Sequence, residues 1–282
     1  MCKRVTAYRA SKILYNLLTS NQERIRAPFM LPANVCVDVP RTFDEAGVPY
    51  QYVDIDVQTL CMDEAYVRDH ALECSGILMV HTYGVEFGLE EFYQQLRSAN
   101  PNILIVDDRC LCMPSLQPDT YGADLVIYSM GDKKQVNLHK GAIGYIAVDV
   151  AYTNHEVSEG FLTNEDWHLK EGELLAVMDA AIAHKEKLNA IYRRALPKSI
   201  QLPEAYQHWR FNILVENKDE ILNALFAEGL FASSHYKALG EEPTPIASNL
   251  ASHVINLFND EYFTEEQAIK ICKIINEILN KR

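Results

Sequence analysis

The sequence predicts an α/β protein, with a mainly parallel sheet flanked by helices and a smaller α+β domain at its carboxyl end. Two segments predict the sheet: ILIVDD over residues 103–108 and ADLVIYSMGDKK over residues 123–134, each an apolar run that ends abruptly in polar residues. An unbroken apolar run of this length is typical of a strand covered on both faces, as in a parallel sheet. Predicted strands and helices also alternate along the first half of the chain, which favours βαβ units.

The composition is that of an acidic globular protein. The chain has 282 residues, 48% of them hydrophobic, enough for one large domain, or a large and a small one, with an ample core. A formal net charge of −13 argues against a general nucleic-acid binder, because such proteins neutralise phosphates with clustered Lys and Arg. No apolar stretch approaches the roughly 20 residues that span a bilayer, and the amino end has no apolar signal-peptide region. We therefore expect a cytoplasmic protein that binds neither nucleic acid nor membrane.

The seven cysteines form no recognisable metal or disulfide pattern. They are scattered through apolar segments, without a CxxC pair or a Cys/His ligand spacing. We therefore expect neither a zinc site nor a disulfide framework, and no bound metal.

Helices and strands alternate in the first part of the chain. Residues 11–18 have apolar side chains at helical spacing, and Gly47 is a suitable stop for a helix over 41–46. The expected helices span residues 11–18, 41–46, 63–72 and 89–99, and the expected strands lie within 26–39, 48–56, 76–81, 103–108 and 125–130. A further strand over 140–148 should double back after a short turn.

The character of the chain changes beyond residue 150. A long helical stretch over 164–196 ends before Pro197, and a strand is expected over 209–215. Two more helices are expected over 218–229 and 263–280, the second with Thr264 as its N-cap. This tail predicts a small α+β domain over residues 196–282, behind a large α/β domain over residues 1–195.

Polar groups gather where two of the predicted strands end. In open α/β sheets, ligands bind just beyond the carboxyl ends of the strands. One strand ends in two aspartates, and the next ends in a serine that two lysines follow, so we expect one crevice to contain Asp107, Asp108, Ser129, Lys133 and Lys134. Pyridoxal phosphate chemistry requires such a set: a lysine that carries the cofactor as a Schiff base, a carboxylate against the pyridinium nitrogen, and hydroxyls for the phosphate.

Seven groups of segments, in the same order, resemble the DegT/DnrJ/StrS family of sugar aminotransferases. They are ASKILYNLL, LPANVCVDV with AGVPYQYVDID, VHTYG, ILIVDD, ADLVIYSMGDKK with KGAIGYI, GLFASSHYKAL and VINLFNDEYFTEEQ. The resemblance runs through nearly the whole chain, which looks shortened relative to the family, mostly at its amino end and in loops. It implies the fold-type-I architecture with a seven-stranded sheet, a pyridoxal 5'-phosphate cofactor and a homodimer. It also implies glutamate as amino donor and a keto-sugar nucleotide as acceptor, in polysaccharide or secondary-metabolite sugar biosynthesis.

The resemblance assigns roles to residues at the strand ends. Asp108 resembles the carboxylate that keeps the pyridine nitrogen protonated; the alternative is an ordinary strand-end aspartate. Asp107 is expected to be a structural neighbour. Ser129 resembles the phosphate-binding serine, and Lys134 lies five residues later, as the Schiff-base lysine does. The competitors for that lysine are Lys133 and Lys140.

Other cofactor contacts come from the first helix and from loops. Ala10 and Ser11 resemble the Gly-Ser/Thr turn whose backbone N–H groups face the phosphate at a helix amino end, although an N-cap role predicts the same serine. Cys36 falls where many relatives carry an aromatic residue over the cofactor ring. His81 ends its strand in the same crevice, either beside the cofactor or as a core histidine. A family segment near the substrate mouth contains His235 and Tyr236.

The chain departs from the family at three places, one before the lysine and two after it. Relatives often carry an Asn-Tyr-Arg segment that reaches the phosphate of the partner subunit, and here His168 and Lys170 of WHLK would have to substitute. Lys140-Gly141 replaces a Gly-Gly pair, and Leu111 replaces a Gln or His. These departures keep a second hypothesis open, a non-catalytic homologue that retains the fold as a binding or regulatory partner. A nucleotide-binding α/β protein is disfavoured because no GxGxxG or P-loop pattern is present.

Overall fold

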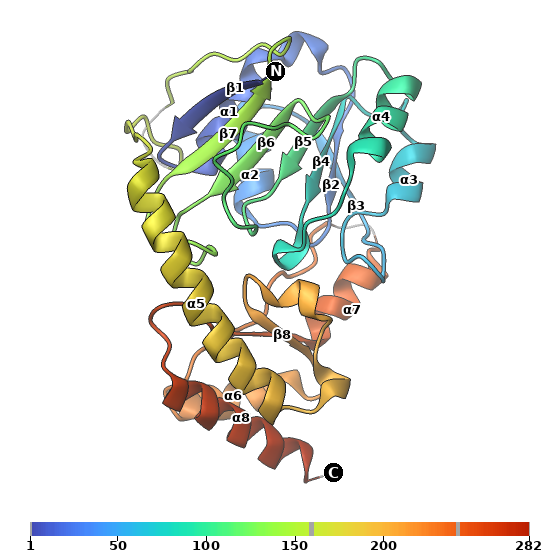
Figure 1. Ribbon diagram of the computed structural model, residues 1–282. Helices are drawn as coiled ribbons and strands as arrows, with labels where there is room; N and C mark the ends of the chain where they lie inside the picture. Colours follow the sequence, from blue (N-terminus) through green and yellow to red (C-terminus); the bar gives the residue numbers. More distant parts are fainter. Residues whose placement is uncertain (1, 158–160, 241–242, 282) are drawn as a thin grey trace.

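We describe the chain from a computed structural model, in which residues 2–157, 161–240 and 243–281 are placed. The upper part of the molecule is a seven-stranded sheet with helices on both faces, and a smaller sheet with its own helices lies below it (Figure 1). The long helix α5 (Glu171–Ala195) runs along one side from the upper part to the lower part.

The large sheet has the strand order β1-β7-β6-β5-β4-β2-β3. Its strands are β1 (Cys2–Ala7), β2 (Phe29–Pro32), β3 (Tyr50–Val53), β4 (Gly76–Val80), β5 (Leu104–Asp108), β6 (Leu125–Ser129) and β7 (Ala142–Ala147). Five strands that are adjacent in the sheet, β3, β2, β4, β5 and β6, are parallel to one another. β7 is antiparallel to both β6 and β1. The prediction of a mainly parallel sheet, with a strand that doubles back after β6, is confirmed, but the connection is a loop over residues 130–141 and not the short turn that we expected.

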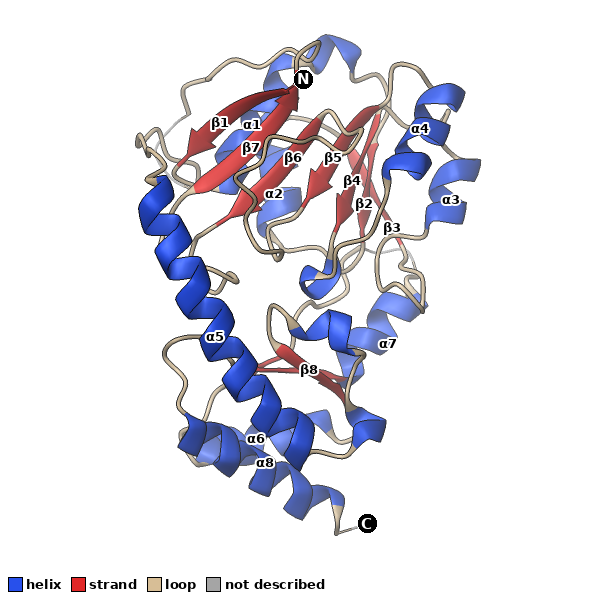
Figure 2. Ribbon diagram, in the orientation of Figure 1, coloured by secondary structure: helices blue, strands red, loops and turns tan. Residues whose placement is uncertain are grey.

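Helices cover both faces of this sheet (Figure 2). On one face lie α1 (Ala10–Ser20) and α2 (Asp38–Ala46), which pack with the even-numbered side chains of β5. On the other face lie α3 (Glu64–Asp69) and α4 (Glu90–Ala99), which pack with the odd-numbered ones. Because side chains alternate along a strand, successive residues of β5 belong to different cores. This alternation decides which polar residues at the strand ends can meet.

The lower part has a three-stranded antiparallel sheet in the order β8-β10-β9. Its elements are β8 (Phe211–Leu214), α6 (Lys218–Ala227), β9 (Ala232–Ser233), α7 (Pro245–His253), β10 (Val254–Leu257) and α8 (Glu265–Leu279). The end of α5 packs into this core through Leu188 and Tyr192, whereas its beginning packs on the upper core through Leu174. Since α5 joins both cores, a domain boundary at residue 195 stays a prediction.

Local signals explain where several elements end. Gly47 adopts φ +65°, a left-handed conformation that glycine accepts without strain, and it ends α2 where predicted. Thr264 caps α8, and its side chain and that of Gln267 bond each other's backbone N–H groups in a capping box.

Four elements were not predicted: β1, β9, α7 and β10. The region 164–170, expected to be helical, is irregular. β1 is an edge strand with mostly half-exposed or exposed residues, so it lacks the apolar run that marks the central strands. Within the residues that the structure describes, no helix combines the length and the apolar character that a membrane crossing requires.

Candidate active site

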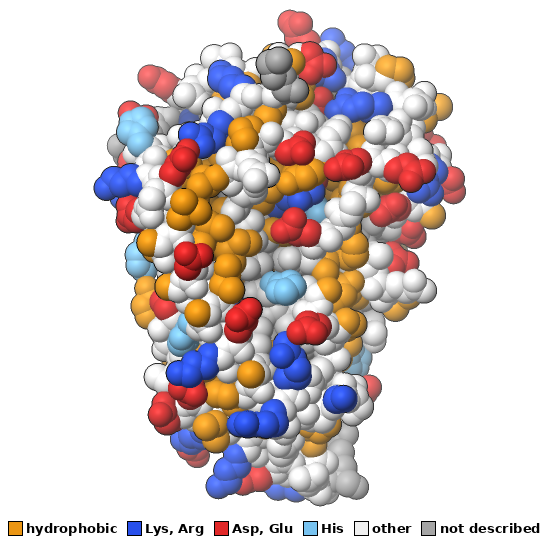
Figure 3. Space-filling model, viewed as in Figure 1, with side chains coloured by type: hydrophobic (Ala, Val, Ile, Leu, Met, Phe, Trp, Pro, Cys, Tyr) orange, Lys and Arg blue, Asp and Glu red, His pale blue; other side chains and the backbone are white. Residues whose placement is uncertain are grey.

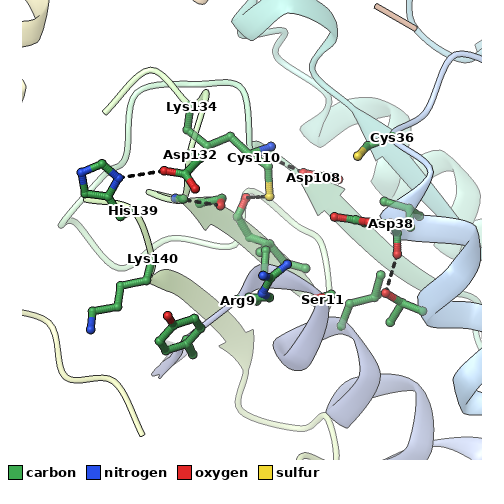
Figure 4. Close-up of a pocket in the computed structure, with 18 residues that line it drawn as sticks. Arg9, Ser11, Cys36, Asp38, Asp108, Cys110, Asp132, Lys134, His139 and Lys140 are labelled. Atoms are coloured by element: carbon green, nitrogen blue, oxygen red, sulfur yellow. Dashed lines mark hydrogen bonds and ion pairs between the residues drawn. The ribbon is translucent and has the colours of Figure 1, made fainter. Parts of the chain in front are cut away.

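A cavity of about 350 Å³ lies at the carboxyl ends of the parallel strands. Its walls come from the ends of β5 and β6, the amino end of α1, the beginning of α2 and the loop between β6 and β7 (Figure 4). The volume is in the range of small-molecule pockets. Six of the predicted site residues line this cavity: Ala10, Ser11, Cys36, Asp108, Ser129 and Lys134.

Asp108 and Ser129 enter the cavity from adjacent strands. Asp108 is the last residue of β5 and is 9% exposed, and its Oδ1 accepts a hydrogen bond from the backbone N–H of Cys110 at 2.9 Å. Ser129 is the last residue of β6, and its Oγ accepts a bond from the backbone N–H of Gly131 at 3.4 Å. Both side chains lie on the α1/α2 face of the sheet. The parallel pairing, with Asp108 opposite Ile127, therefore brings the carboxylate of Asp108 and the hydroxyl of Ser129 to the same face.

Asp107 points to the opposite face, where it is fully buried. Its carboxylate contacts Arg109 Nε at 3.2 Å and His81 Nε2 at 2.8 Å. Burial alone would raise the pKa of Asp107, but the close contact with His81 and the charge and hydrogen bonds of Arg109 hold that pKa below its ordinary value. Asp107 is thus part of a buried ion-pair network behind the cavity.

His81 belongs to this buried network and does not line the cavity. Its ring is fully buried, with Nδ1 2.9 Å from the carbonyl oxygen of Val85 and Nε2 against Asp107. It continues the alternation of β4, in which odd-numbered residues face α3 and α4. Side chains alternate between the two faces along β4, and Val80 pairs with Asp108, so His81 points to the opposite face. The sequence prediction did not take this alternation into account.

Lys134 is the half-buried lysine of the three candidates. It lies in the β6–β7 loop and lines the cavity, whereas Lys133 is exposed and outside the lining and Lys140 is exposed at the rim. Burial raises the pKa of the Cys36 and Cys110 thiols, and the nearby Lys134 amine opposes that rise in both. Lys134 therefore lies close to both thiols. Cys110 was not among the predicted site residues.

The amino end of α1 opens into the cavity. The helix begins at Ala10 and no side chain caps it, so Ser11 is not the N-cap but a residue of the first turn. First-turn N–H groups and the helix dipole favour an anion at this point. Arg9, which sequence reasoning also missed, adds a cation to the lining directly before the helix. Its position in the sequence, immediately before a predicted helix start, was the available signal.

His168 and Lys170 lie away from the cavity of their own chain. Both are exposed in the irregular segment before α5, and His168 lines a separate hollow beside Lys12 and His155. A cofactor contact from His168 would thus require a second copy of the chain.

The lower part of the molecule approaches the cavity through His235 and Tyr236. The Tyr83 hydroxyl donates a hydrogen bond of 2.6 Å to the carbonyl of His235. Burial, together with the positive charges of Arg210 and of the two lysines of the β6–β7 loop, lowers the pKa of His235 to about 4. The imidazole is therefore neutral at pH 7.

Among the residues that the structure places, no group of three or more His, Cys, Asp or Glu side chains is arranged to hold a metal ion.

Comparison with known proteins identifies the fold. No family model and no curated protein matches the sequence. Three similar solved structures are Helicobacter pylori PseC, an aminotransferase involved in the biosynthesis of pseudoaminic acid (15% identity, TM-score 0.76, 99% of this chain and 87% of that chain); a DegT DnrJ EryC1 StrS aminotransferase from Brucella abortus (14%, 0.72, 98% and 85%); and DesI in the presence of its TDP-sugar product (16%, 0.74, 97% and 80%). The chain thus has the fold of these aminotransferases, and the predicted α/β architecture with a seven-stranded sheet is confirmed.

Proposed function

We propose that the protein is a pyridoxal phosphate-dependent aminotransferase that moves an amino group from glutamate to a keto-sugar nucleotide. One observation carries this proposal: a buried carboxylate, a hydroxyl, a half-buried amine and an uncapped helix start share one cavity. The similar structures support the choice of chemistry, since they are aminotransferases and one of them holds a TDP-sugar product.

The donor set fits pyridoxal phosphate in charge and position. The first turn of α1, Arg9 and Ser129 would hold the phosphate, because a helix amino end, a guanidinium and a hydroxyl all favour an anion. Asp108 would face the ring nitrogen from the end of β5. Cys36 would lie beside the ring, and Lys134 would hold the cofactor by its amine.

When bound, the cofactor supplies an electron-poor ring that stabilises negative charge on the substrate carbon. Asp108 would keep a proton on the ring nitrogen, because a carboxylate at close range favours the protonated form. Lys134 would move a proton between the reacting carbon atoms as a general acid and base. Its half-buried position limits competition from water at that atom.

The visible absorption spectrum tests the proposal directly. We expect the purified protein with pyridoxal phosphate to show an absorption band near that of the lysine-bound cofactor, and glutamate should bleach it. Lys134→Ala should abolish the band, whereas Lys133→Ala and Lys140→Ala should retain it. Borohydride reduction followed by peptide mass spectrometry should place the label on Lys134. A protein that stays colourless with added cofactor would overturn the proposal.

A non-catalytic homologue is the second candidate. The observation in its favour is that His168 and Lys170 stand where relatives often carry the Asn-Tyr-Arg segment, so the groups that would reach the phosphate of the partner subunit are changed. A band that forms through Lys134 but persists unchanged with glutamate and every sugar-nucleotide acceptor tested would favour this candidate over the enzyme.

We further propose that the protein forms a homodimer in the cytoplasm. Apolar side chains are exposed on and beside the upper half of α5 (Figure 3). Two of them belong to α5 itself: Leu175 is 50% exposed and Ile182 is 40% exposed. A second copy placed there would cover this surface, and it would offer a route for His168 to reach a neighbouring cavity.

A further inference from the structure

Trp209 connects the lower part of the molecule to the loop that carries Lys134. Its indole Nε1–H donates a hydrogen bond of 2.7 Å to the backbone carbonyl of Lys133, the residue immediately before Lys134. The Trp209 side chain comes from the segment before β8, 76 residues along the chain, and the residue is only 3% exposed. A partly buried hydrogen bond thus spans the two parts of the molecule next to the proposed reactive amine.

The indole is itself held rigidly. It stacks nearly parallel to Tyr83, with ring centroids 6.0 Å apart, and to Tyr236, with centroids 6.5 Å apart. The backbone carbonyl of Trp209 accepts a hydrogen bond of 2.9 Å from the buried Lys185 amine. A donor held by two near-parallel aromatic rings and through its backbone has little freedom to follow a moving loop, so it imposes its own position on the Lys133 carbonyl.

The backbone that Trp209 holds is strained. Lys133 has φ +65°, in the left-handed region that is unfavourable for residues with a Cβ atom. Such conformations persist where surrounding contacts impose them. The next residue, Lys134, bonds its N–H to the carbonyl of Gly131 at 3.3 Å and closes the turn. The direction of the Lys134 side chain therefore depends on a turn that the indole helps to maintain.

A second contact fixes the other side of the lysine. The side-chain amide of Gln135 is buried and donates a hydrogen bond of 2.8 Å to the carbonyl of Leu111, in the loop that follows Asp108. Lys134 is consequently flanked by two residues with external hydrogen bonds. One bond ties the loop to the lower part of the molecule, and the other ties it to the end of β5.

We propose that Trp209 is a positioning residue that selects Lys134, rather than Lys133, as the amine directed into the cavity. This inference rests on the proposed function. The exposed Lys133 side chain is the immediate competitor, and the held turn keeps it outside the cavity lining. Without the indole N–H, the turn can leave the left-handed conformation, and both side chains gain access to an aldehyde bound in the cavity.

The test compares Trp209→Phe with Tyr192→Phe, which removes a side-chain hydrogen bond of 2.8 Å to the backbone carbonyl of Phe258 in the lower core. Each purified protein is incubated with pyridoxal phosphate and reduced with borohydride, and the labelled lysines are quantified by peptide mass spectrometry. We expect exclusive labelling of Lys134 in the unaltered protein and in Tyr192→Phe. In Trp209→Phe, labelling of Lys134 should slow by about five- to tenfold, the effect of losing one hydrogen bond, and Lys133 should carry a measurable share.

Hydrogen exchange tests the anchor without any cofactor. The peptide spanning residues 131–138 should exchange faster in Trp209→Phe than in the unaltered protein, and at an unchanged rate in Tyr192→Phe. A variant with benzothienylalanine at position 209, which keeps both fused rings and removes only the N–H, should behave like Trp209→Phe and separates the lost bond from lost packing.

The outcomes distinguish the two proposals. Exclusive labelling of Lys134 at the original rate in the Trp209 variants, with unchanged exchange, would overturn the positioning role and leave the proposed function intact. No labelling of any lysine in the unaltered protein would overturn the proposed function, and with it the selection between the two lysines. Faster exchange in the variants would then support only the structural anchor.

Discussion

Asp107 and Asp108 are neighbours in the chain, yet the pleat of β5 directs them to opposite faces of the sheet. Asp107 is buried against Arg109 and His81, where its charge is compensated within the protein. Asp108 faces the cavity, and its contact is the backbone N–H of Cys110. One aspartate is therefore needed for stability, and the other is free for a ligand.

Substitution of the two aspartates should separate these tasks. Asp107→Asn breaks a buried ion pair and should lower the free energy of unfolding by about 3–5 kcal/mol, measured by chemical denaturation. Asp108→Asn should change it by less than about 1 kcal/mol, while weakening pyridoxal phosphate binding by about tenfold or more, because a charged hydrogen bond is lost. Equal loss of stability in the two variants would contradict this division.

His235 predicts a specific pH dependence of stability. Its pKa in the folded protein is lowered to about 4, whereas an unfolded histidine titrates near 6.5. As the pH falls from about 6.5 towards 4, the unfolded chain takes up a proton that the folded chain does not, so His235 makes the fold progressively less stable across this window.

His235→Gln removes this titration. The melting temperature of the unaltered protein should therefore fall more steeply between pH 7 and pH 4.5 than that of the variant, as followed by differential scanning fluorimetry. The acidic groups common to both proteins cancel in the difference. If the melting temperatures of the two proteins fall by the same amount between pH 7 and pH 4.5, His235 is protonated as readily in the folded state as in the unfolded state.

At the scale of elements, apolar runs and turn residues predict the central strands and most helices correctly. β4, β5 and β6 are buried along their whole lengths, so their sequences are continuously apolar and recognisable. β1 is different, because it is an edge strand whose residues are mostly half-exposed or exposed. β10 is buried, but it has only four residues, one of them Asn256, and it follows α7 directly, so its local pattern is too short to mark a strand.

Substitution of two glycines by alanine tests how closely the elements pack. A Cβ atom on Gly76, at the start of β4, would lie 2.3 Å from the Phe29 ring and 2.6 Å from the carbonyl oxygen of Leu104, so Gly76→Ala should destabilise the protein by about 1–3 kcal/mol. Gly172, in the first turn of α5, has no atom within 4 Å of that position, and Gly172→Ala should stabilise it by about 0.5 kcal/mol. Thermal unfolding of both variants checks the opposite signs.

At the scale of the whole molecule, the proposed homodimer makes the surface beside α5 an interface. Analytical ultracentrifugation at micromolar concentration should give a mass of about 64 kDa, twice the chain mass of 32.1 kDa. Leu175→Asp should shift the protein towards monomer, because a charge would be buried in the interface. Leu72→Asp, at a residue that is 78% exposed near α3, is the matched control and should leave the mass unchanged. A monomeric unaltered protein would contradict the dimer.

The local sequence is sufficient to predict the α/β class, the parallel sheet and the candidate groups at the ends of β5 and β6, because buried strands are continuously apolar and end in polar residues. Only the three-dimensional arrangement shows which of those groups lie together. The alternation of side chains along the strands places Asp108 and Ser129 in one cavity and His81 on the opposite face. A left-handed turn at Lys133 leaves Lys134 in the cavity lining and Lys133 outside it. The bond from Trp209 to that turn joins residues far apart in the chain, and such a contact has no local pattern from which it could be predicted.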